Sequence, residues 1–298
     1  MTTAVDAVAA PRPRKRSFLQ RYPILRRLLK HKAFVVGAGL FLIIALVALL
    51  ADLIAPSDPT RMAVRFRFRP PSSEFWFGTD NLGRSLVSRI VYGARLSLGI
   101  GLAVVILNAV FGVALGAASG YFKRLDDILM RVTDALMAFP PVLLALGIAA
   151  ALGPSSLTAA IALAAVYIPR TARIVRASVL VVREMEFVQA ALAMGASNWR
   201  ILRKHVLPNC MAPLIVQLTF VFAYAVVTEA TLSFLGLGAP PPTPTWGNMI
   251  AEGRQYIRDA EWITLIPGLA LALTVLSLNL LGDGLRDVLD PRLKISQD

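Results

Sequence analysis

Few side chains in this sequence are of the types that carry out covalent or metal chemistry. The chain has two histidines, His31 and His205, and a single cysteine, Cys210. One cysteine allows no intramolecular disulfide and no thiolate cage, and two histidines far apart in sequence do not form a His-rich metal site. The sequence also has no Gly-x-Ser-x-Gly stretch, in which many hydrolases present a nucleophilic serine. We therefore expect no catalytic residue and no metal site. The usual residues of an intramembrane hydrolase are missing from this sequence.

Glu229 is an ionisable residue inside an apolar stretch that runs from about Met211 to Leu237. A charge at mid-membrane costs about 2.5 to 3.5 kcal/mol on insertion scales, so this carboxyl should face protein or water. It could line a substrate pathway and meet a substrate amino group, or carry protons in an autonomous proton-coupled carrier. It could equally be a structural partner for a helix end or for a nearby polar side chain. The sequence leaves these readings open.

No pattern for binding the phosphates of a nucleotide is present. The Gly-Lys-Ser/Thr core of a phosphate-binding loop needs a glycine before the lysine, and every lysine here follows another residue type. We therefore expect this chain to bind no cofactor. An ATP-driven process would require its ATPase on another chain.

The chain that must position these residues is strongly apolar. Of its 298 residues 56% are hydrophobic and only 16% are charged, and the mean hydropathy is +0.65. A span of the bilayer core takes about 20 apolar residues in helical form, because every backbone polar group there needs an internal partner. The sequence predicts an all-α polytopic membrane protein with six transmembrane helices. These lie at about 33–55, 96–121, 128–153 (broken by Pro140 and Pro141), 157–170, 211–237 and 262–282.

Basic residues predict the orientation of these helices. Lysine and arginine in the flanking segments tend to stay on the cytoplasmic side of a membrane. With the N-terminus inside, 22 of the 31 basic residues fall in cytoplasmic segments and 9 fall outside. We therefore expect both termini in the cytoplasm. The formal net charge of +13 then reflects topology and attraction to membrane lipid, and no nucleic-acid partner is expected.

The predicted spans divide the chain into segments. Residues 1–32 are a basic cytoplasmic tail whose first 17 residues lack hydrophobic periodicity and are expected to be disordered. The first transmembrane helix, 33–55, is too long for a cleavable signal peptide and is expected to remain as an anchor. An extracytoplasmic segment follows at 56–95, and the other five spans lie within 96–284. Residues 285–298 form a second cytoplasmic tail.

Two smaller patterns predict local packing. Gly112, Gly116 and Gly120 recur at four-residue spacing in the second span, which leaves a flat strip for a close helix neighbour. Trp246 and Trp262 flank the outer ends of the last two spans, where we expect them in the aromatic belt at the membrane interface.

The segment 184–208 is longer than a connection between two spans needs to be. A helix is predicted over 184–194, with acidic residues in its first turn and Gly195 as its C-terminal stop. Ser197 could cap a second, basic helix over 198–207 that ends before the fifth span.

Two readings of this segment are possible. The helices could lie on the membrane surface as an amphipathic pair, with Trp199 and Leu202 on their apolar face. Alternatively, they could form a rigid knob in which the small residues Ala190 and Ala191 present a low-profile face to another protein.

This segment resembles the EAA loop of ATP-binding-cassette importer permeases, the coupling helix that docks into a cleft on the cytoplasmic ATPase. Gln189 replaces the usual Glu of that loop, and His205 stands where an apolar residue is commonest. The resemblance implies that the matching residues couple ATP hydrolysis to transport. They are Gln189, Ala190, Ala191, Gly195, His205, Leu207 and Pro208.

Further stretches resemble the second permease subunit of the dipeptide, oligopeptide and nickel branch of that class. One reads FGTDNLGRSLVSRIVYGARLSL over 77–98. Another reads EATLSFLGLGAPPPTPTWG over 229–247 and is joined by NLLGDGLRDVLDPR over 279–292. Together with the coupling segment they cover most of the chain after residue 75, which makes the resemblance specific.

The resemblance implies one anchor span plus a five-span core in the inner membrane of a bacterium. It implies a second six-span permease as heterodimer partner, two cytoplasmic ABC ATPase subunits or domains that hydrolyse ATP, and an extracytoplasmic solute-binding protein. Residues 80–92 and 240–246 are then candidates for contact with the binding protein. The expected function is ATP-driven import of di- or oligopeptides or related solutes, such as nickel chelates and glutathione-like compounds. The alternatives are a proton-coupled carrier using Glu229 and an intramembrane hydrolase.

Overall fold

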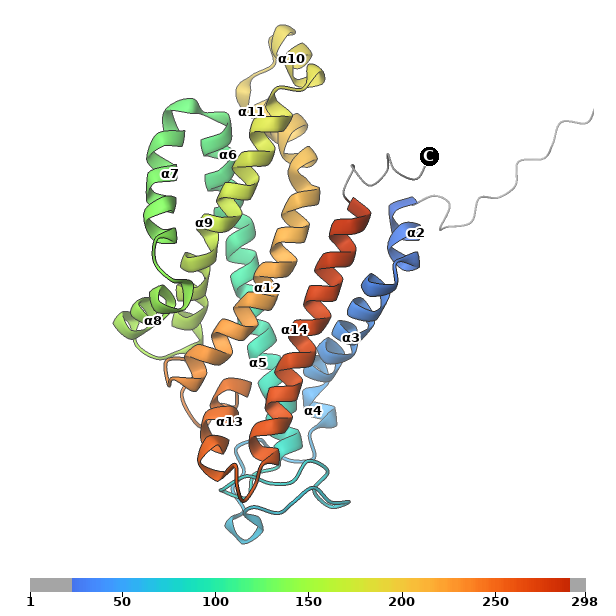
Figure 1. The fold of residues 1–298 in the computed structure, drawn as a ribbon, viewed down its shortest axis with the longest axis vertical. Helices are drawn as coiled ribbons and strands as arrows, with labels where there is room; N and C mark the ends of the chain where they lie inside the picture. Colours follow the sequence, from blue (N-terminus) through green and yellow to red (C-terminus); the bar gives the residue numbers. More distant parts are fainter. Residues whose placement is uncertain (1–22, 290–298) are drawn as a thin grey trace, which may run out of the picture.

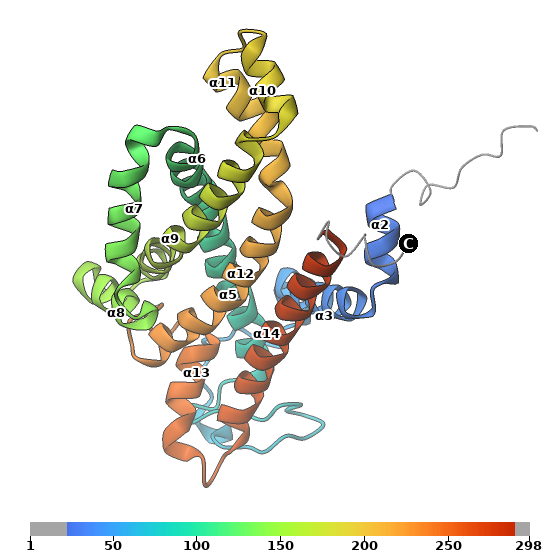
Figure 2. The ribbon, with the colours of Figure 1, turned by 45° about the horizontal axis from the view of Figure 1, so that its top comes forward.

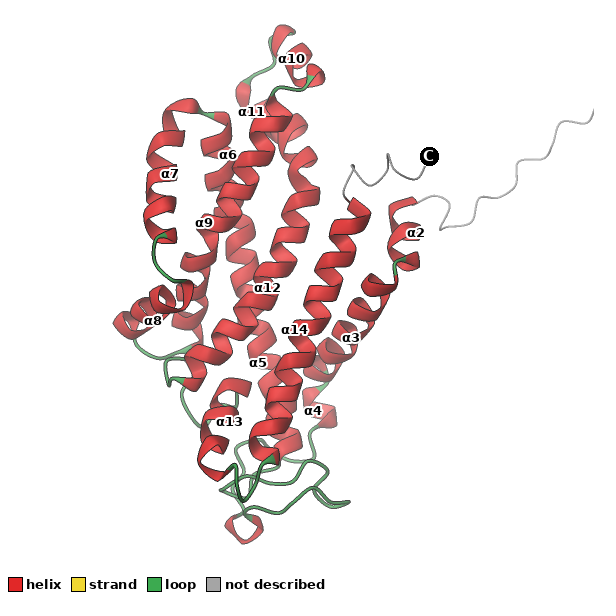
Figure 3. Cartoon of the chain, viewed as in Figure 1, coloured by secondary structure: helices red, strands yellow, loops and turns green. Residues whose placement is uncertain are grey.

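The structure is a computed structural model, and it describes residues 23–289. The disordered tail expected for residues 1–17 and most of the second predicted tail lie outside the described residues. Within residues 23–289 the elements are helices, turns and loops, with no strand (Figure 3).

Five helical columns are long and apolar enough to cross a membrane, and they run along the long axis of the molecule (Figure 1). The second column contains a π-helical turn at Asn108–Gly112 that joins α5 to α6. The columns consist of α3 (Lys32–Leu49), α5 (Leu86–Leu107) with α6 (Val113–Tyr121), α9 (Ser156–Arg183), α12 (Met211–Phe234) with the turns before it, and α14 (Trp262–Leu289).

The remaining predicted span is a bent pair of helices. α7 (Lys123–Met137) and α8 (Pro141–Leu152) meet at 92° and together pass the test for one broken span. The bend has a local cause, because a residue before proline is disfavoured in helical geometry and Pro140 precedes Pro141. Pro141 then starts α8, where its missing N–H costs no hydrogen bond. The six predicted spans thus correspond to five columns and this bent pair.

Two helices extend well beyond the spans predicted for them. α5 begins at Leu86, ten residues before the predicted start, with the Ser85 hydroxyl accepting the Ser88 N–H. α9 continues to Arg183 instead of ending near Arg170. The arginines after Arg170 suggested an end to the apolar span, but their charges are compensated within the bundle, as described below.

Small residues bring the helices close together. A Cβ added at Gly112 would lie 2.8 Å from Thr171 of α9, and one added at Gly120 would lie 2.8 Å from Val179. Gly116 lies between these two glycines and packs against Ala172 and Val175 of α9. The expectation that this glycine strip accepts a close helix neighbour is confirmed.

The two ends of the bundle differ in what they carry (Figures 1 and 2). One end bears α10 (Glu186–Ala193) and α11 (Asn198–Ile201), and we call it the α10 end. The other bears the loop 55–85 and α13 (Trp246–Gly253), and we call it the α13 end. The short α2 (Pro23–Lys30) and the last residues of α14 point towards the α10 end (Figure 1).

Trp246 does not sit in an interfacial belt, so that expectation is wrong. Its side chain is only 1% exposed and packs with Leu86, Ile90 and Met249, and its indole N–H donates to the Ile90 carbonyl at 3.2 Å. The partly buried indole of Trp262 donates to the Thr79 carbonyl at 3.1 Å.

Candidate functional site

The α10 end is a compact helical knob, which comprises α10, α11 and the π-helical turn Leu202–Val206. α10 ends in a Schellman motif: the Gly195 N–H donates to Leu192 at 2.9 Å, and the Ala196 N–H donates to Ala191 at 3.1 Å. Gly195 has φ of +79°, a left-handed conformation that strains residues with a side chain. The predicted glycine stop is therefore present, and it fixes the angle between α10 and α11.

The second helix of the knob does not end before the fifth span, contrary to the prediction. Residues Asn198–Phe234 form one column, in which α11 passes through the π turn and a 3₁₀ turn, Leu207–Cys210, into α12. Pro208 lies in the first turn of that 3₁₀ segment, where its missing N–H is tolerated. Ser197 takes the extended N-cap conformation but makes no capping hydrogen bond with its side chain.

The knob is held by its own apolar core. Val188, Ala191 and Ile201 are buried together with Val179 and Val182 near the end of α9. Leu202 and Val206 join the same cluster, which reaches Leu214 in α12. The knob is thus packed on the ends of two membrane-crossing columns.

The exposed side of the knob is rich in large apolar side chains. Met194 is 82% exposed and Trp199 is 67% exposed, and Phe187 and Leu192 are also exposed. Trp199 and Leu202 stand at helical spacing, but Trp199 is exposed whereas Leu202 is buried in the knob core. These four side chains are absent from the predicted site set, because the resemblance directs attention to the small residues.

The seven predicted coupling residues divide by exposure. Gln189, Ala190, Gly195 and Pro208 are exposed, His205 and Leu207 are half-buried, and Ala191 is buried in the knob core. Ala190 alone of the two alanines therefore lies on the surface. Gln189 donates its side-chain N–H to the Arg183 carbonyl at 3.0 Å, which satisfies a free carbonyl at the end of α9.

A cavity of about 610 Å³ lies beside the knob, between α10 and the turn from α6 to α7. Its lining includes Lys123, Arg124 and Arg183 with one carboxylate, Glu184, so its charge is positive. The Tyr121 hydroxyl donates to the Asn198 side chain across it at 3.1 Å.

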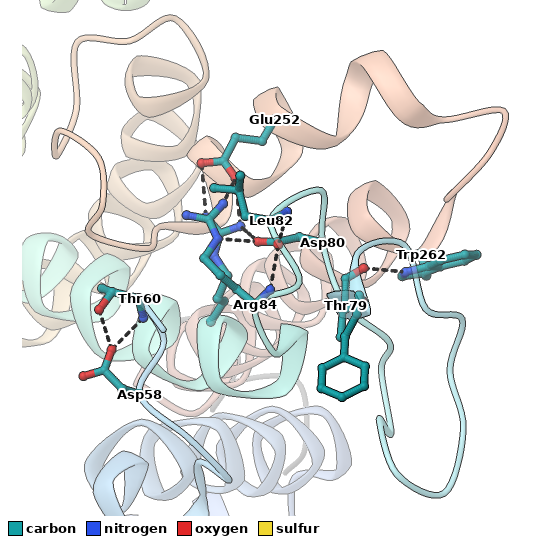
Figure 4. A network of polar contacts seen from close by, with 10 residues as sticks. Asp58, Thr60, Thr79, Asp80, Leu82, Arg84, Glu252 and Trp262 are labelled. Atoms are coloured by element: carbon teal, nitrogen blue, oxygen red, sulfur yellow. Dashed lines mark hydrogen bonds and ion pairs between the residues drawn. The ribbon is translucent and has the colours of Figure 1, made fainter. Parts of the chain in front are cut away.

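The α13 end is built around a buried ionic network (Figure 4). Asp80 accepts from Arg84 Nε and from Arg89 Nη1, each at 2.6 Å. Glu252 of α13 accepts from Arg84 Nη2 at 2.7 Å and from Arg89 Nη1 at 2.8 Å. Asp80, Arg84 and Arg89 are buried, so these side chains fasten the loop to α5 and α13 and are not free to meet a binding protein.

Asp58 is an exposed carboxylate in the same loop. It accepts the Thr60 N–H at 2.7 Å and the Thr60 hydroxyl at 2.5 Å, and these hydrogen bonds hold the pKa of the carboxyl below its ordinary value.

Glu229 lies inside the bundle with no exposed surface. It accepts from the Ser97 hydroxyl of α5 at 2.8 Å and from the Ser233 hydroxyl, one turn further along α12, at 2.6 Å. Both carboxylate oxygens thus have partners within the chain, and the geometry is that of a polar tie between α5 and α12.

The two histidines serve different elements. His31 accepts the Phe34 N–H at the start of α3 and lies 3.2 Å from Asp287 of α14 through its other ring nitrogen. His205 belongs to the π turn of the knob, where its carbonyl accepts from Asn209 at 2.7 Å.

Comparison with known proteins gives relatives along nearly the whole chain. A putative peptide transport system permease protein of Brucella abortus is 57% identical over 270 residues, which is 91% of each chain. The dipeptide transport system permease protein of Alkalihalophilus pseudofirmus is 44% identical and covers 90% of this chain and 89% of its own. The di/tripeptide transport system permease protein of Pseudomonas aeruginosa is 45% identical and covers 89% of this chain and 90% of its own.

The fold is also found in a solved structure. The MetNI methionine ABC transporter, in an inward-facing conformation, has a chain that superimposes with a TM-score of 0.56 at 21% identity. The match covers 67% of this chain and 95% of that one.

Two family descriptions match consecutive parts of the sequence. Residues 17–71 match the N-terminal TM domain of oligopeptide transport permease C, and residues 95–295 match the binding-protein-dependent transport system inner membrane component. With spanning helices, a knob packed on two of them and these relatives, the chain belongs to the family of inner membrane components of binding-protein-dependent transport systems.

Proposed function

We propose that this chain is one permease subunit of an ATP-driven importer that moves di- or oligopeptides across the bacterial inner membrane. The family match and the peptide, dipeptide and di/tripeptide transporters among its relatives support this cargo class. The observation that carries the coupling role is the knob, because it is rigid, apolar at its tip and packed on two spanning columns.

The knob is the docking site for a cytoplasmic ABC ATPase in this proposal. Exposed Met194 and Trp199 are the side chains best suited to bury in a cleft of that partner, since large apolar groups dominate interface energetics. Movement of the ATPase would pass through the knob core to α9 and α12. ATP is bound and hydrolysed by the partner subunits, and this chain contributes no cofactor site.

This assignment places the α10 end in the cytoplasm and the α13 end outside. α2 and the end of α14 point towards the α10 end, which supports both termini on the cytoplasmic side. The full assembly would contain a second six-span permease, two ATPase subunits or domains, and a solute-binding protein that meets the α13 end.

The two alternatives gain no support. A proton-coupled carrier would need Glu229 to reach water, but both of its oxygens are occupied by Ser97 and Ser233 inside the bundle. The relatives described above are named as transport permeases and not as hydrolases, so they give no support to an intramembrane hydrolase.

The direct test is to purify the tagged chain in mild detergent, after crosslinking in intact membranes, and to identify its stoichiometric partners. We expect a second permease and one or two ATPases. Recovery of the chain without an ATPase after crosslinking would contradict the proposal and favour an autonomous carrier.

A further inference from the structure

A groove of about 810 Å³ runs between α9 and α12 in the half of the bundle nearest the α10 end. We call it the α9–α12 groove. α9 contributes Ile174, Ser178 and Val181, and α12 contributes Pro213, Gln217 and Phe220. Arg286 of α14 is the one charged residue among its described lining residues.

Arg170 and Tyr224 continue the two lining stripes by one helical turn towards the middle of the bundle. Arg170 precedes Ile174 by four residues on α9, and Tyr224 follows Phe220 by four on α12, so each lies on the same helix face as its neighbour. Both side chains are exposed in this chain. An arginine and a tyrosine therefore lie one helical turn beyond the lining residues at the inner end of the groove.

The two side chains are arranged as a pair. The Arg170 guanidinium carbon lies 5.8 Å from the centre of the Tyr224 ring, within the range of a cation–π contact. The Tyr224 ring in turn stacks on Tyr167 with centroids 6.3 Å apart. The Tyr167 hydroxyl is 2.8 Å from the Thr228 hydroxyl, which fixes the second ring.

Arg170 lies halfway along its helix. It is 14 residues after Ser156 and 13 before Arg183, so about 20 Å of helix separates it from either end. An arginine at such depth in a membrane faces protein or a water-filled path, because exposure of its charge to lipid is costly. Arg170 lies on the same face of α9 as Ile174, which lines the α9–α12 groove.

Arg170 differs from the next arginines of α9 in having no carboxylate partner. Arg173 is 2.6 Å from Asp134 and Arg176 is 2.5 Å from Asp126, both on α7. Among residues 23–289 no carboxylate lies within ion-pair distance of Arg170, so its fork of donors is available to a group from outside this chain.

We propose that Arg170, one helical turn beyond the inner end of the α9–α12 groove, is a substrate-binding residue that takes the terminal carboxylate of a peptide in transit. The inference rests on the proposed function and adds the residue and the substrate group. A guanidinium binds a carboxylate through two parallel charge-assisted hydrogen bonds. Every unmodified peptide carries that carboxylate whatever its side chains, and a groove of this size is within the range of small-molecule sites.

The first test measures uptake by the complete importer reconstituted in liposomes with its binding protein and ATP, with dialanine as the probe. Arg170→Gln should lower uptake at least tenfold, and Arg170→Lys should recover part of it. Arg173→Gln, one turn away, is the matched control and should stay within twofold of the wild type. The same uptake in Arg170→Gln as in the wild type would overturn the inference alone. Absence of ATP-dependent uptake by the wild type would overturn the proposed function, and the inference with it.

The second test asks whether water and peptide reach this position. Arg170→Cys, in a Cys210→Ala background, should react with a membrane-impermeant methanethiosulfonate in assembled complexes, and dialanine should slow the reaction. Leu276→Cys is the control, because Leu276 is exposed and lies equally halfway along α14. No labelling of Arg170→Cys would contradict the inference. Loss of the second permease from purified Arg170→Gln complexes would also contradict it. Such a loss would indicate that the Arg170 guanidinium of the wild type forms an ion pair with a carboxylate of the second permease.

Discussion

The two ends of this molecule are stabilised by different interactions. The α13 end is fastened by buried charges, since Asp80 and Glu252 hold Arg84 and Arg89 between a loop, α5 and α13. The α10 end relies on an apolar core and on one left-handed glycine, and it leaves Met194 and Trp199 exposed. The buried charges of the α13 end are therefore paired within this chain, whereas the exposed apolar tip of the α10 end suits a partner.

The largest effect is expected at the α13 end. Asp80→Ala removes the carboxylate between two buried guanidinium groups, and breaking a buried pair costs about 3 to 5 kcal/mol because a charge is left unpaired. We expect the unfolding temperature in detergent to fall sharply and the yield of folded protein to drop. Asp58→Ala, an exposed carboxylate in the same loop, is the control and should change little. Equal stability of the two variants would remove the contrast between the ends.

Changing the exposed tip of the knob should impair binding and spare the fold. Met194→Glu combined with Trp199→Glu places charges where we expect burial against the ATPase, and hot-spot losses are about 2 kcal/mol or more, roughly thirtyfold in affinity. Co-purification of the ATPase should be lost at an unchanged unfolding temperature. Lys204→Gln, also exposed on the knob, should keep the ATPase bound.

Gly195 tests the geometry of the knob. Beyond its two chain neighbours, no residue has an atom within 4 Å of a Cβ built there, so the effect of a substitution comes from the backbone conformation and not from a clash. Gly195→Val should cost about 1 to 2 kcal/mol, because a β-branched residue is strained at positive φ, and should uncouple ATP hydrolysis from uptake. Gly195→Asn should retain most coupling, since asparagine tolerates that region. Full coupling in the valine variant would show that the angle between α10 and α11 is not needed.

The smallest effect is expected at Glu229. Glu229→Gln can keep a hydrogen bond to Ser97 or Ser233, so we expect a loss of about 1 kcal/mol or less and uptake within threefold of the wild type. Uptake should be measured with and without a proton gradient. Abolished uptake in this variant, with an intact fold, would favour the carrier alternative.

Much of the architecture could be predicted from the sequence because it depends on local signals. Apolar stretches located the spanning columns, Gly195 marked the end of α10, and the glycine strip marked a close helix contact. The seven coupling residues rested on resemblance, and their role stays a prediction. Their exposure is a property of the folded knob, in which Ala191 faces inward and Ala190 outward.

Several predictions were wrong because they depended on partners distant in sequence. Arg170 appeared to end a span, because the carboxylates of α7 that compensate the arginines after it lie some 40 to 50 residues away. The Asp80 network requires Glu252, which is 168 residues beyond Arg84. Trp246 is buried only because α5 begins early enough to pack against it. No periodicity within a short window contains this information.

The unbroken column Asn198–Phe234 has a mechanical consequence. At about 1.5 Å per residue it is roughly 55 Å long, with the exposed tip of the knob at one end and Tyr224 partway along it. Only the π turn and the 3₁₀ turn, and no loop, separate α11 from α12. We therefore expect a tilt of α11 to shift Tyr224 relative to Arg170 as well, so that movement of the knob would weaken or strengthen the binding of a carboxylate.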